Sequence, residues 1–248
     1  MILVVIPKGF NPEGSAFVED CVDAGSVERF VDSQLEPPVV GFLHGPAGPL
    51  RDALVLTHGA GSNCEIPHLI ALAEAFADKG FLVLRCDLPF RQKSPYGPPP
   101  FGSAERDREG LRNAVSAVRQ LVPGRAFLGG SSYGGRQATM LAASNPKLVA
   151  GLLLLSYPLH PPRKPGQPRI QHFPSLQTPA LFVHGTRDPF GSENEILEAL
   201  RLIPAPTRLL KIEGAGHDLK ATAKRQVAGD PSLADRVVSE FLAFFARI

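Results

Sequence analysis

The sequence predicts an α/β fold, a three-layer α/β/α sandwich around a mostly parallel sheet, with no large cap domain. Short apolar runs alternate with segments whose apolar residues recur at helical spacing, which is typical of such a sandwich. The runs 53–57 and 151–155 are apolar nearly throughout, which indicates strands covered on both faces. We expect residues 27–248 to form a single domain. Residues 1–26 are expected to form an N-terminal arm, because prolines and glycines interrupt any regular element there.

Helix starts follow from capping signals. Pro67 opens one helix at its first position, and Ser192 with Glu195 forms a capping box for another. Ser103 is expected to cap a third helix, and Asp230 to begin the closing helix. The remaining expected elements are a helix at 137–144, strands at 27–31, 39–43, 53–57, 81–84, 125–128, 151–155, 180–183 and 208–212, and proline-rich loops at 94–101 and 158–179.

Composition excludes few classes of protein but favours a soluble one. The hydrophobic content is 44% and the formal net charge is +2, which gives no case for nucleic acid. Cys21, Cys64 and Cys86 have no metal-ligand spacing, and their odd number favours free thiols in a reducing compartment. The apolar opening ends at Pro7, too short for a membrane span. We therefore expect a cytoplasmic protein with no metal, cofactor, nucleic-acid or membrane partner.

The most informative stretch is Gly129–Arg136, which reads GGSSYGGR. It lies between a short apolar run and an alanine-rich helical segment. Strand, tight glycine turn and helix form the context in which a G-x-S-x-G motif exposes a nucleophilic serine. Gly130 and Gly134 take the glycine positions, where backbones come close, and Ser132 takes the serine position. Ser131 occupies a variable position and is not expected to be the nucleophile.

Asp188 and His217 each follow a predicted strand, as Ser132 does. In mostly parallel sheets, reactive groups gather in loops beyond the carboxyl ends of strands. His217 could take the serine proton near neutral pH and return it to the leaving group. Asp188 would hold the imidazole in the correct tautomer and stabilise the imidazolium. We therefore expect Ser132, Asp188 and His217 to form a catalytic triad.

Four motifs carry a resemblance to a known family: Leu56–Gly61, Gly129–Arg136, His184–Gly191 and Gly214–His217. On these motifs the chain resembles the α/β-hydrolase superfamily, in which serine, acid and histidine follow one another in this order. It is most similar to the small dienelactone-hydrolase-like members and to a testis-expressed hydrolase-like branch. The resemblance implies the α/β-hydrolase fold. Dienelactone hydrolases proper carry a cysteine nucleophile, so Ser132 is a departure from that family.

The expected function is cleavage of a carboxylic ester or thioester of a small molecule through an acyl-enzyme on Ser132. Two donors would hold the oxyanion: the N–H of Tyr133 and an N–H of the loop after Thr57, at Ala60. The alternative is a hydrolase-fold protein used mainly for binding or scaffolding. The triad together with the glycine loops favours the enzyme, because a scaffold would not need all of them.

Three further residues compete for roles. His58 is interpreted as structural, or as shaping the oxyanion loop. Asp87 also follows a strand and is the alternative to Asp188 as the acid. Asp218 is interpreted as a solvated neighbour of the catalytic histidine. His160 and His172 are too isolated to indicate a metal site.

Basic residues follow strands on the expected active-site edge: Arg91 and Lys93 in one loop, and Arg163, Lys164 and Arg169 in another. One hypothesis is a preference for substrates that carry a carboxylate. The alternative is a solvated basic loop. Because the second loop contains no clear helical pattern, we expect an open or loop-covered pocket.

Overall fold

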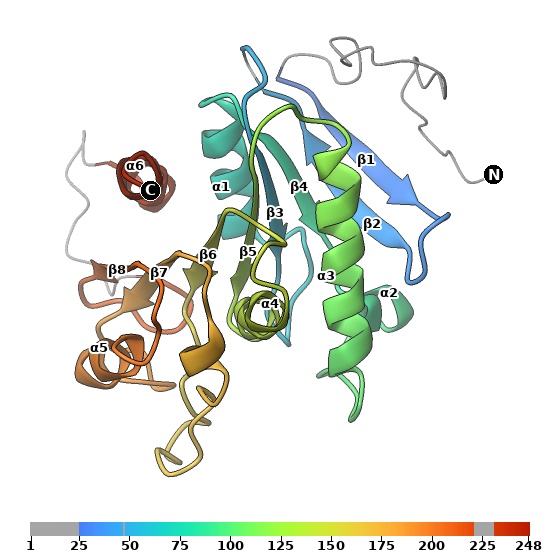
Figure 1. Ribbon diagram of the computed structural model, residues 1–248. Coiled ribbons are helices and arrows are strands. Elements are labelled where there is room, and N and C mark those ends of the chain that lie inside the picture. The colour runs from blue at the N-terminus through green and yellow to red at the C-terminus, as the bar shows by residue number, and fades with distance from the viewer. Residues whose placement is uncertain (1–24, 47, 221–230) are drawn as a thin grey trace. The chain divides into compact units, whose positions relative to one another are not determined.

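The computed structural model describes residues 25–46, 48–220 and 231–248 (Figure 1). The predicted N-terminal arm lies almost wholly outside these residues. In the part of the chain described, eight strands form a mostly parallel sheet in the order β1-β2-β4-β3-β5-β6-β7-β8. The predicted α/β-hydrolase fold without a large cap is thus confirmed. The chain divides into two compact units, residues 1–128 and 129–248, which are described separately below.

The sheet of the first unit begins with a hairpin. Strands β1 (Val27–Asp32) and β2 (Val39–His44) pair antiparallel, as their alternating patterns predict. Strand β2 then pairs antiparallel with β4 (Leu82–Cys86), which pairs parallel with β3 (Ala53–Thr57). Every residue of β3 and β4 is buried, which explains why these runs are apolar with little alternation.

Helices α1 (Pro67–Ala77) and α3 (Ala104–Arg119) lie on opposite faces of the first unit's sheet (Figure 1). Ser103 precedes α3, but its hydroxyl makes no cap and donates instead to Asp107 Oδ2 at 3.2 Å. The cap predicted there is therefore wrong. A short helix, α2 (Pro89–Lys93), also stands where a loop was expected.

Strand β5 (Ala126–Ser131) crosses the division and leads into α4 (Tyr133–Ser144), the helix after the glycine turn. In the second unit, β7 (Ala180–Gly185) pairs parallel with β6 (Gly151–Leu155) on one side and with β8 (Thr207–Ile212) on the other. The carboxyl ends of these strands consequently point the same way.

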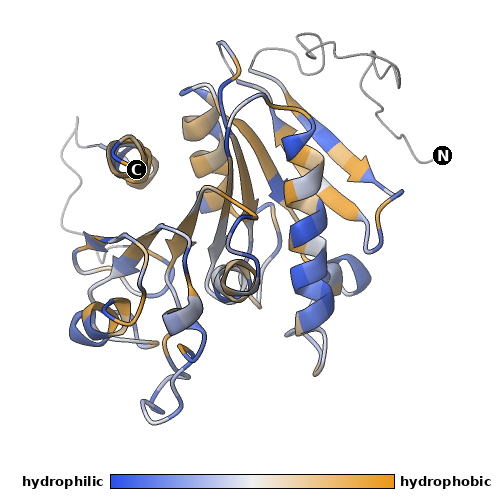
Figure 2. Ribbon diagram, viewed as in Figure 1, coloured by the Kyte–Doolittle hydropathy of each residue, from blue (hydrophilic) through white to orange (hydrophobic). Residues whose placement is uncertain are grey.

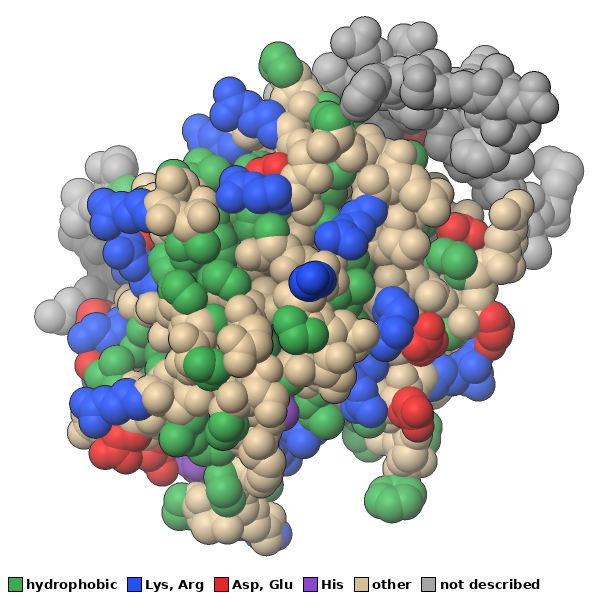
Figure 3. Space-filling model, in the orientation of Figure 1, with side chains coloured by type: hydrophobic (Ala, Val, Ile, Leu, Met, Phe, Trp, Pro, Cys, Tyr) green, Lys and Arg blue, Asp and Glu red, His purple; other side chains and the backbone are tan. Residues whose placement is uncertain are grey.

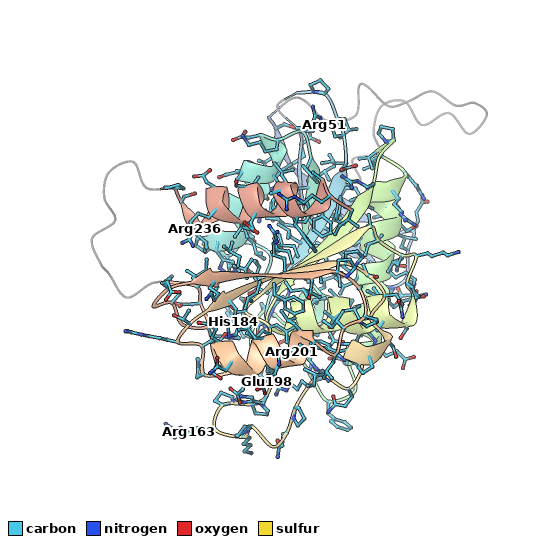
Figure 4. All side chains as sticks on the ribbon, turned by 60° about the vertical axis from the view of Figure 1, so that its left-hand side comes forward. Arg51, Arg163, His184, Glu198, Arg201 and Arg236 are labelled. Carbon is cyan, nitrogen blue, oxygen red and sulfur yellow. The ribbon has the colours of Figure 1, made fainter. Side chains whose placement is uncertain are left out.

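The second unit is covered by helices on both faces. In Figure 4, α5 (Glu193–Leu200) and α6 (Leu233–Phe245) lie on opposite sides of the strands. The predicted capping box at the start of α5 is present. For α6 the cap is Ser232, whereas the predicted start at Asp230 lies outside the described residues. Between β6 and β7 the chain forms loops and one 3₁₀ turn, η1 (Phe173–Ser175).

Hydrophobic residues follow the strands, whereas the outer side of α3 is hydrophilic (Figure 2). On the face shown in Figure 3, Lys and Arg side chains are spread over the surface and do not gather in one patch. None of the helices described is both long enough and apolar enough to cross a bilayer.

Candidate active site

Ser132 stands between β5 and α4 in a strained conformation. Its φ is +49° and its ψ is −112°, outside the regions that residues with a side chain favour. The turn is tight enough that a Cβ on Gly130 would lie 2.6 Å from backbone atoms of Gly134 and Gly135. Glycine is required there for steric reasons. The Ser132 N–H donates to Leu155 O at 2.8 Å, which fixes the turn against the end of β6.

The second unit brings together the three residues expected to form the triad. His217 Nε2 lies 2.8 Å from Ser132 Oγ, and His217 Nδ1 lies 2.8 Å from Asp188 Oδ2. Asp188 accepts from Nδ1–H, so Nε2 carries the lone pair and accepts from the serine hydroxyl. The His217 side chain is 24% exposed, whereas that of Asp188 is fully buried. The arrangement can carry a proton from serine to imidazole beside a shielded carboxylate.

Asp188 is held by its own loop. Its Oδ1 accepts the Phe190 N–H at 2.8 Å, leaving Oδ2 for His217. The Phe190 ring stacks on the imidazole of His217, with centroids 4.1 Å apart and planes 29° apart. Phe190 falls within the motif His184–Gly191, but the sequence carries no signal for its role, because only the folded loop brings its ring onto the imidazole.

A second histidine, His184, lies beside the same carboxylate. It is buried at the end of β7, and its Nε2–H donates to Gly191 O at 2.7 Å. Its Nδ1 is 3.9 Å from Asp188 Oδ2, too far for a hydrogen bond, and has no partner among the described residues. Figure 4 shows His184 between the strands and α5. His184 therefore fixes the loop after β7 through its carbonyl contact.

The two expected oxyanion donors lie in different units. Tyr133 is the first residue of α4, directly after Ser132. Ala60 lies in the first unit, in the loop after β3, where its carbonyl accepts from Arg91 Nη2 at 2.8 Å. Arg91 also donates to Ser62 O, at 2.9 Å, and its other contacts are with the carbonyls of Ser94 and Gly97.

Arg91 is thus a buried structural residue of α2 and does not lie in a loop that could offer it to a substrate. His58 is also engaged with the backbone: Nδ1–H donates to Gly59 O at 2.7 Å, and Nε2 accepts from the Leu88 N–H at 3.1 Å. Burial lowers the pKa of His58, in keeping with a neutral ring. Asp87 Oδ1 accepts the Cys64 N–H at 2.7 Å.

The remaining candidates take other places. Ser131 is buried at the end of β5, and Asp218 is exposed and accepts the Lys220 N–H at 3.1 Å. His160 and His172 bond to Pro161 O and Thr139 Oγ1, respectively. Across the residues described, no group of histidine, cysteine and acidic side chains could hold a metal ion.

Fold and site define the class to which this chain belongs. An alpha/beta hydrolase domain family matches residues 50–246, and the chain belongs to that family. Its solved structural neighbours include a dienelactone hydrolase and P91, a dienelactone hydrolase-like promiscuous phosphotriesterase, which agrees with the resemblance seen in the sequence.

Three solved structures illustrate the similarity. The dienelactone hydrolase from Anabaena variabilis shares 20% identity at a TM-score of 0.67, covering 90% of this chain and 98% of its own. TT1662 from Thermus thermophilus shares 26% identity at a TM-score of 0.61, with coverage of 90% and 98%. XC6422 from Xanthomonas campestris, described as a serine hydrolase without a lid, shares 16% identity at a TM-score of 0.57, with coverage of 77% and 86%.

Proposed function

We propose that this hydrolase cleaves a carboxylic ester or thioester of a small molecule through an acyl-enzyme on Ser132. The observation that carries the proposal is the continuous chain of hydrogen bonds from Ser132 Oγ through His217 to Asp188, with both links at 2.8 Å. A serine hydroxyl is a poor nucleophile at neutral pH and needs a base within this distance.

In the proposed reaction, Ser132 Oγ attacks the carbonyl carbon while His217 Nε2 takes its proton. Asp188 stabilises the imidazolium that forms. His217 then gives the proton to the leaving alkoxide or thiolate. In the second half of the reaction His217 takes a proton from water, whose oxygen attacks the acyl carbon, and returns that proton to Ser132 Oγ as the acid is released. The N–H groups of Tyr133 and Ala60 are proposed to hold the oxyanion; each such donor contributes about 3–4 kcal/mol to transition-state stabilisation. These steps need no cofactor.

The absence of a helical insertion in the described stretch between β6 and β7 supports a small-molecule substrate that enters an open or loop-covered pocket. We further propose that the protein acts in the cytoplasm and has neither a nucleic-acid nor a membrane partner. A structural neighbour called a dienelactone hydrolase supports the hydrolysis of an ester bond in general.

A fluorophosphonate probe tests the proposal, because it reacts only with an activated serine. Wild-type protein is expected to be labelled and Ser132→Ala to be unlabelled, while Ser131→Ala keeps its labelling as the matched control. A folded wild-type protein that takes up no label would favour a binding or scaffolding role. A p-nitrophenyl ester series of increasing acyl length would then define the acyl preference.

A further inference from the structure

Among the residues that the structure describes, two arginines of the second unit have no counter-ion: Arg136 on α4 and Arg169 in the loop after β6. Neither guanidinium makes a hydrogen bond or an ion pair with any residue that the structure describes. Both side chains are half-buried, and Arg136 Nε is fully buried without a partner in the described part of the chain. A buried guanidinium nitrogen without a hydrogen-bond acceptor is costly to the fold.

The two charges also act on each other. Burial lowers the pKa of Arg169, and the positive charge of Arg136 lowers it further. Both charges also act on Tyr157, which does not neutralise them: burial raises the pKa of its hydroxyl, which donates to Arg169 O at 2.7 Å. The fold therefore holds two like charges close together, an arrangement that an anion would stabilise.

The surrounding sequence contributes no carboxylate. Helix α4 and the segment 156–179 contain no aspartate or glutamate.

The backbone around both arginines is well anchored. Thr139 Oγ1 donates to Arg136 O at 2.8 Å and lies 2.8 Å from His172 Nε2, which joins α4 to the loop. The Arg169 N–H donates to Leu159 O at 2.7 Å.

Backbone hydrogen bonds join the segments that carry both arginines to residues of the proposed triad or to their neighbours. The Arg136 N–H donates to Ser132 O at 3.0 Å, so Arg136 stands one helical turn, about 5 Å, beyond the serine. The loop that carries Arg169 is tied to the loop of Asp188, because the His160 N–H donates to Phe190 O at 3.1 Å. Phe190 in turn stacks on His217.

We propose that Arg136 and Arg169 form a subsite for an anionic group, a carboxylate or a phosphate, on the substrate of the reaction proposed above. Planar guanidinium groups suit such oxyanions because they offer paired N–H donors. This proposal rests on the proposed function and narrows its substrate class to esters with an anionic substituent.

The other basic residues of the loop do not share this position. Arg163 and Lys164 are exposed, and Figure 4 shows Arg163 in the outlying part of the loop, beyond Glu198 and Arg201 of the α5 region. Arg163 therefore provides a control with the same change of charge in the same loop.

The test compares two activated esters of similar size, p-nitrophenyl butyrate and the mono-p-nitrophenyl ester of glutaric acid. The measured quantity is the ratio of kcat/KM for the anionic ester to that for the neutral one. We expect Arg136→Gln and Arg169→Gln each to lower this ratio at least about tenfold, and added salt to lower it in the wild type. Arg163→Gln is expected to leave the ratio within about twofold. An unchanged ratio in both subsite variants, or an equal fall in Arg163→Gln, would overturn the subsite.

A second readout does not depend on turnover. The Tm of Ser132→Ala is measured with glutarate, with inorganic phosphate and with sodium chloride at equal ionic strength. If glutarate raises the Tm, the ligand is a carboxylate, and if phosphate raises it, the ligand is a phosphate. Either rise should disappear when Arg136→Gln is added to Ser132→Ala. If neither anion raises Tm above the chloride control, the subsite is rejected. If wild-type protein shows neither probe labelling nor ester turnover, but an anion still raises the Tm, the proposed function is rejected while the anion-binding site is supported.

Discussion

The ring of Phe190 lies stacked on the imidazole of His217, with centroids 4.1 Å apart, while the backbone N–H of the same residue donates to Asp188. One residue thus contacts two members of the proposed triad. The ring limits the freedom of the imidazole, and the N–H occupies the carboxylate oxygen that His217 does not use.

Replacement of Phe190 by alanine should remove the ring and keep the backbone hydrogen bond. Since ring stacking contributes about 0.5–1.5 kcal/mol, kcat/KM for an ester should fall about three- to tenfold. Phe190→Leu, which keeps an apolar cover, should lose less. Phe101→Ala is the control, because its side chain is fully exposed. Equal activity of Phe190→Ala and wild type would show that the ring has no part in positioning His217.

The carboxylate of Asp188 is expected to set the tautomer of His217. In Asp188→Asn the amide group can donate to Nδ1 of His217. The imidazole proton then resides on Nε2, and Nε2 can no longer accept the proton of the serine hydroxyl. By analogy with serine proteases, kcat should fall about 10⁴-fold. Steady-state kinetics of this variant should be compared with Asp87→Asn. A larger loss in Asp87→Asn would assign the acid to the first unit, contrary to the proposal.

The sequence predicts the strands and the serine turn of the proposed triad because these depend on local signals. Buried strands are apolar throughout, as β3 is, and the nucleophile turn needs glycine at Gly130 for steric reasons. Asp188 and His217 could be found because both follow strands of a parallel sheet, so their positions follow from topology.

The sequence-based predictions are wrong or incomplete where contacts between residues distant in the sequence determine the structure. Helix α2 has five residues, too few to show a helical period, so the sequence predicts a loop in which Arg91 could bind an anionic substrate. Ser103 looked like a cap but bonds to Asp107, whose other oxygen accepts the Phe90 N–H at 3.0 Å. Arg136 was part of a quoted motif, yet only the structure shows that its guanidinium lacks a described partner.

Arg91 should stabilise the loop after β3 by donating to the carbonyls of Ala60 and Ser62. Arg91→Ala leaves several carbonyls without their donor and should lower the free energy of unfolding by about 3 kcal/mol. Urea denaturation measures this loss. Lys93→Ala, an exposed neighbour on the same helix, should change stability by less than about 0.5 kcal/mol. Comparable stability of Arg91→Ala and Lys93→Ala would contradict a structural role for Arg91.

A buried histidine–arginine pair in the first unit predicts a pH dependence of stability. Arg85 Nε–H donates to His44 Nε2 at 2.7 Å, and both residues are buried. Burial, reinforced by the charge of Arg85, lowers the pKa of His44 from 6.5 to about 4. A ring that already accepts a hydrogen bond from a cation cannot take up a proton without losing that bond.

The sign of the effect follows from where each state binds the proton. Below pH 6.5 the unfolded chain protonates His44, whereas the folded chain resists protonation until about pH 4. The contribution of His44 to stability is therefore complete above pH 6.5 and is lost as the pH falls toward 4, by at most about 3 kcal/mol. His44→Gln keeps an acceptor for Arg85 but cannot titrate, so its free energy of unfolding should fall less steeply over this range. Urea denaturation at pH 7, 5.5 and 4.5 measures the difference, and parallel curves for the two proteins would show that His44 titrates alike in both states.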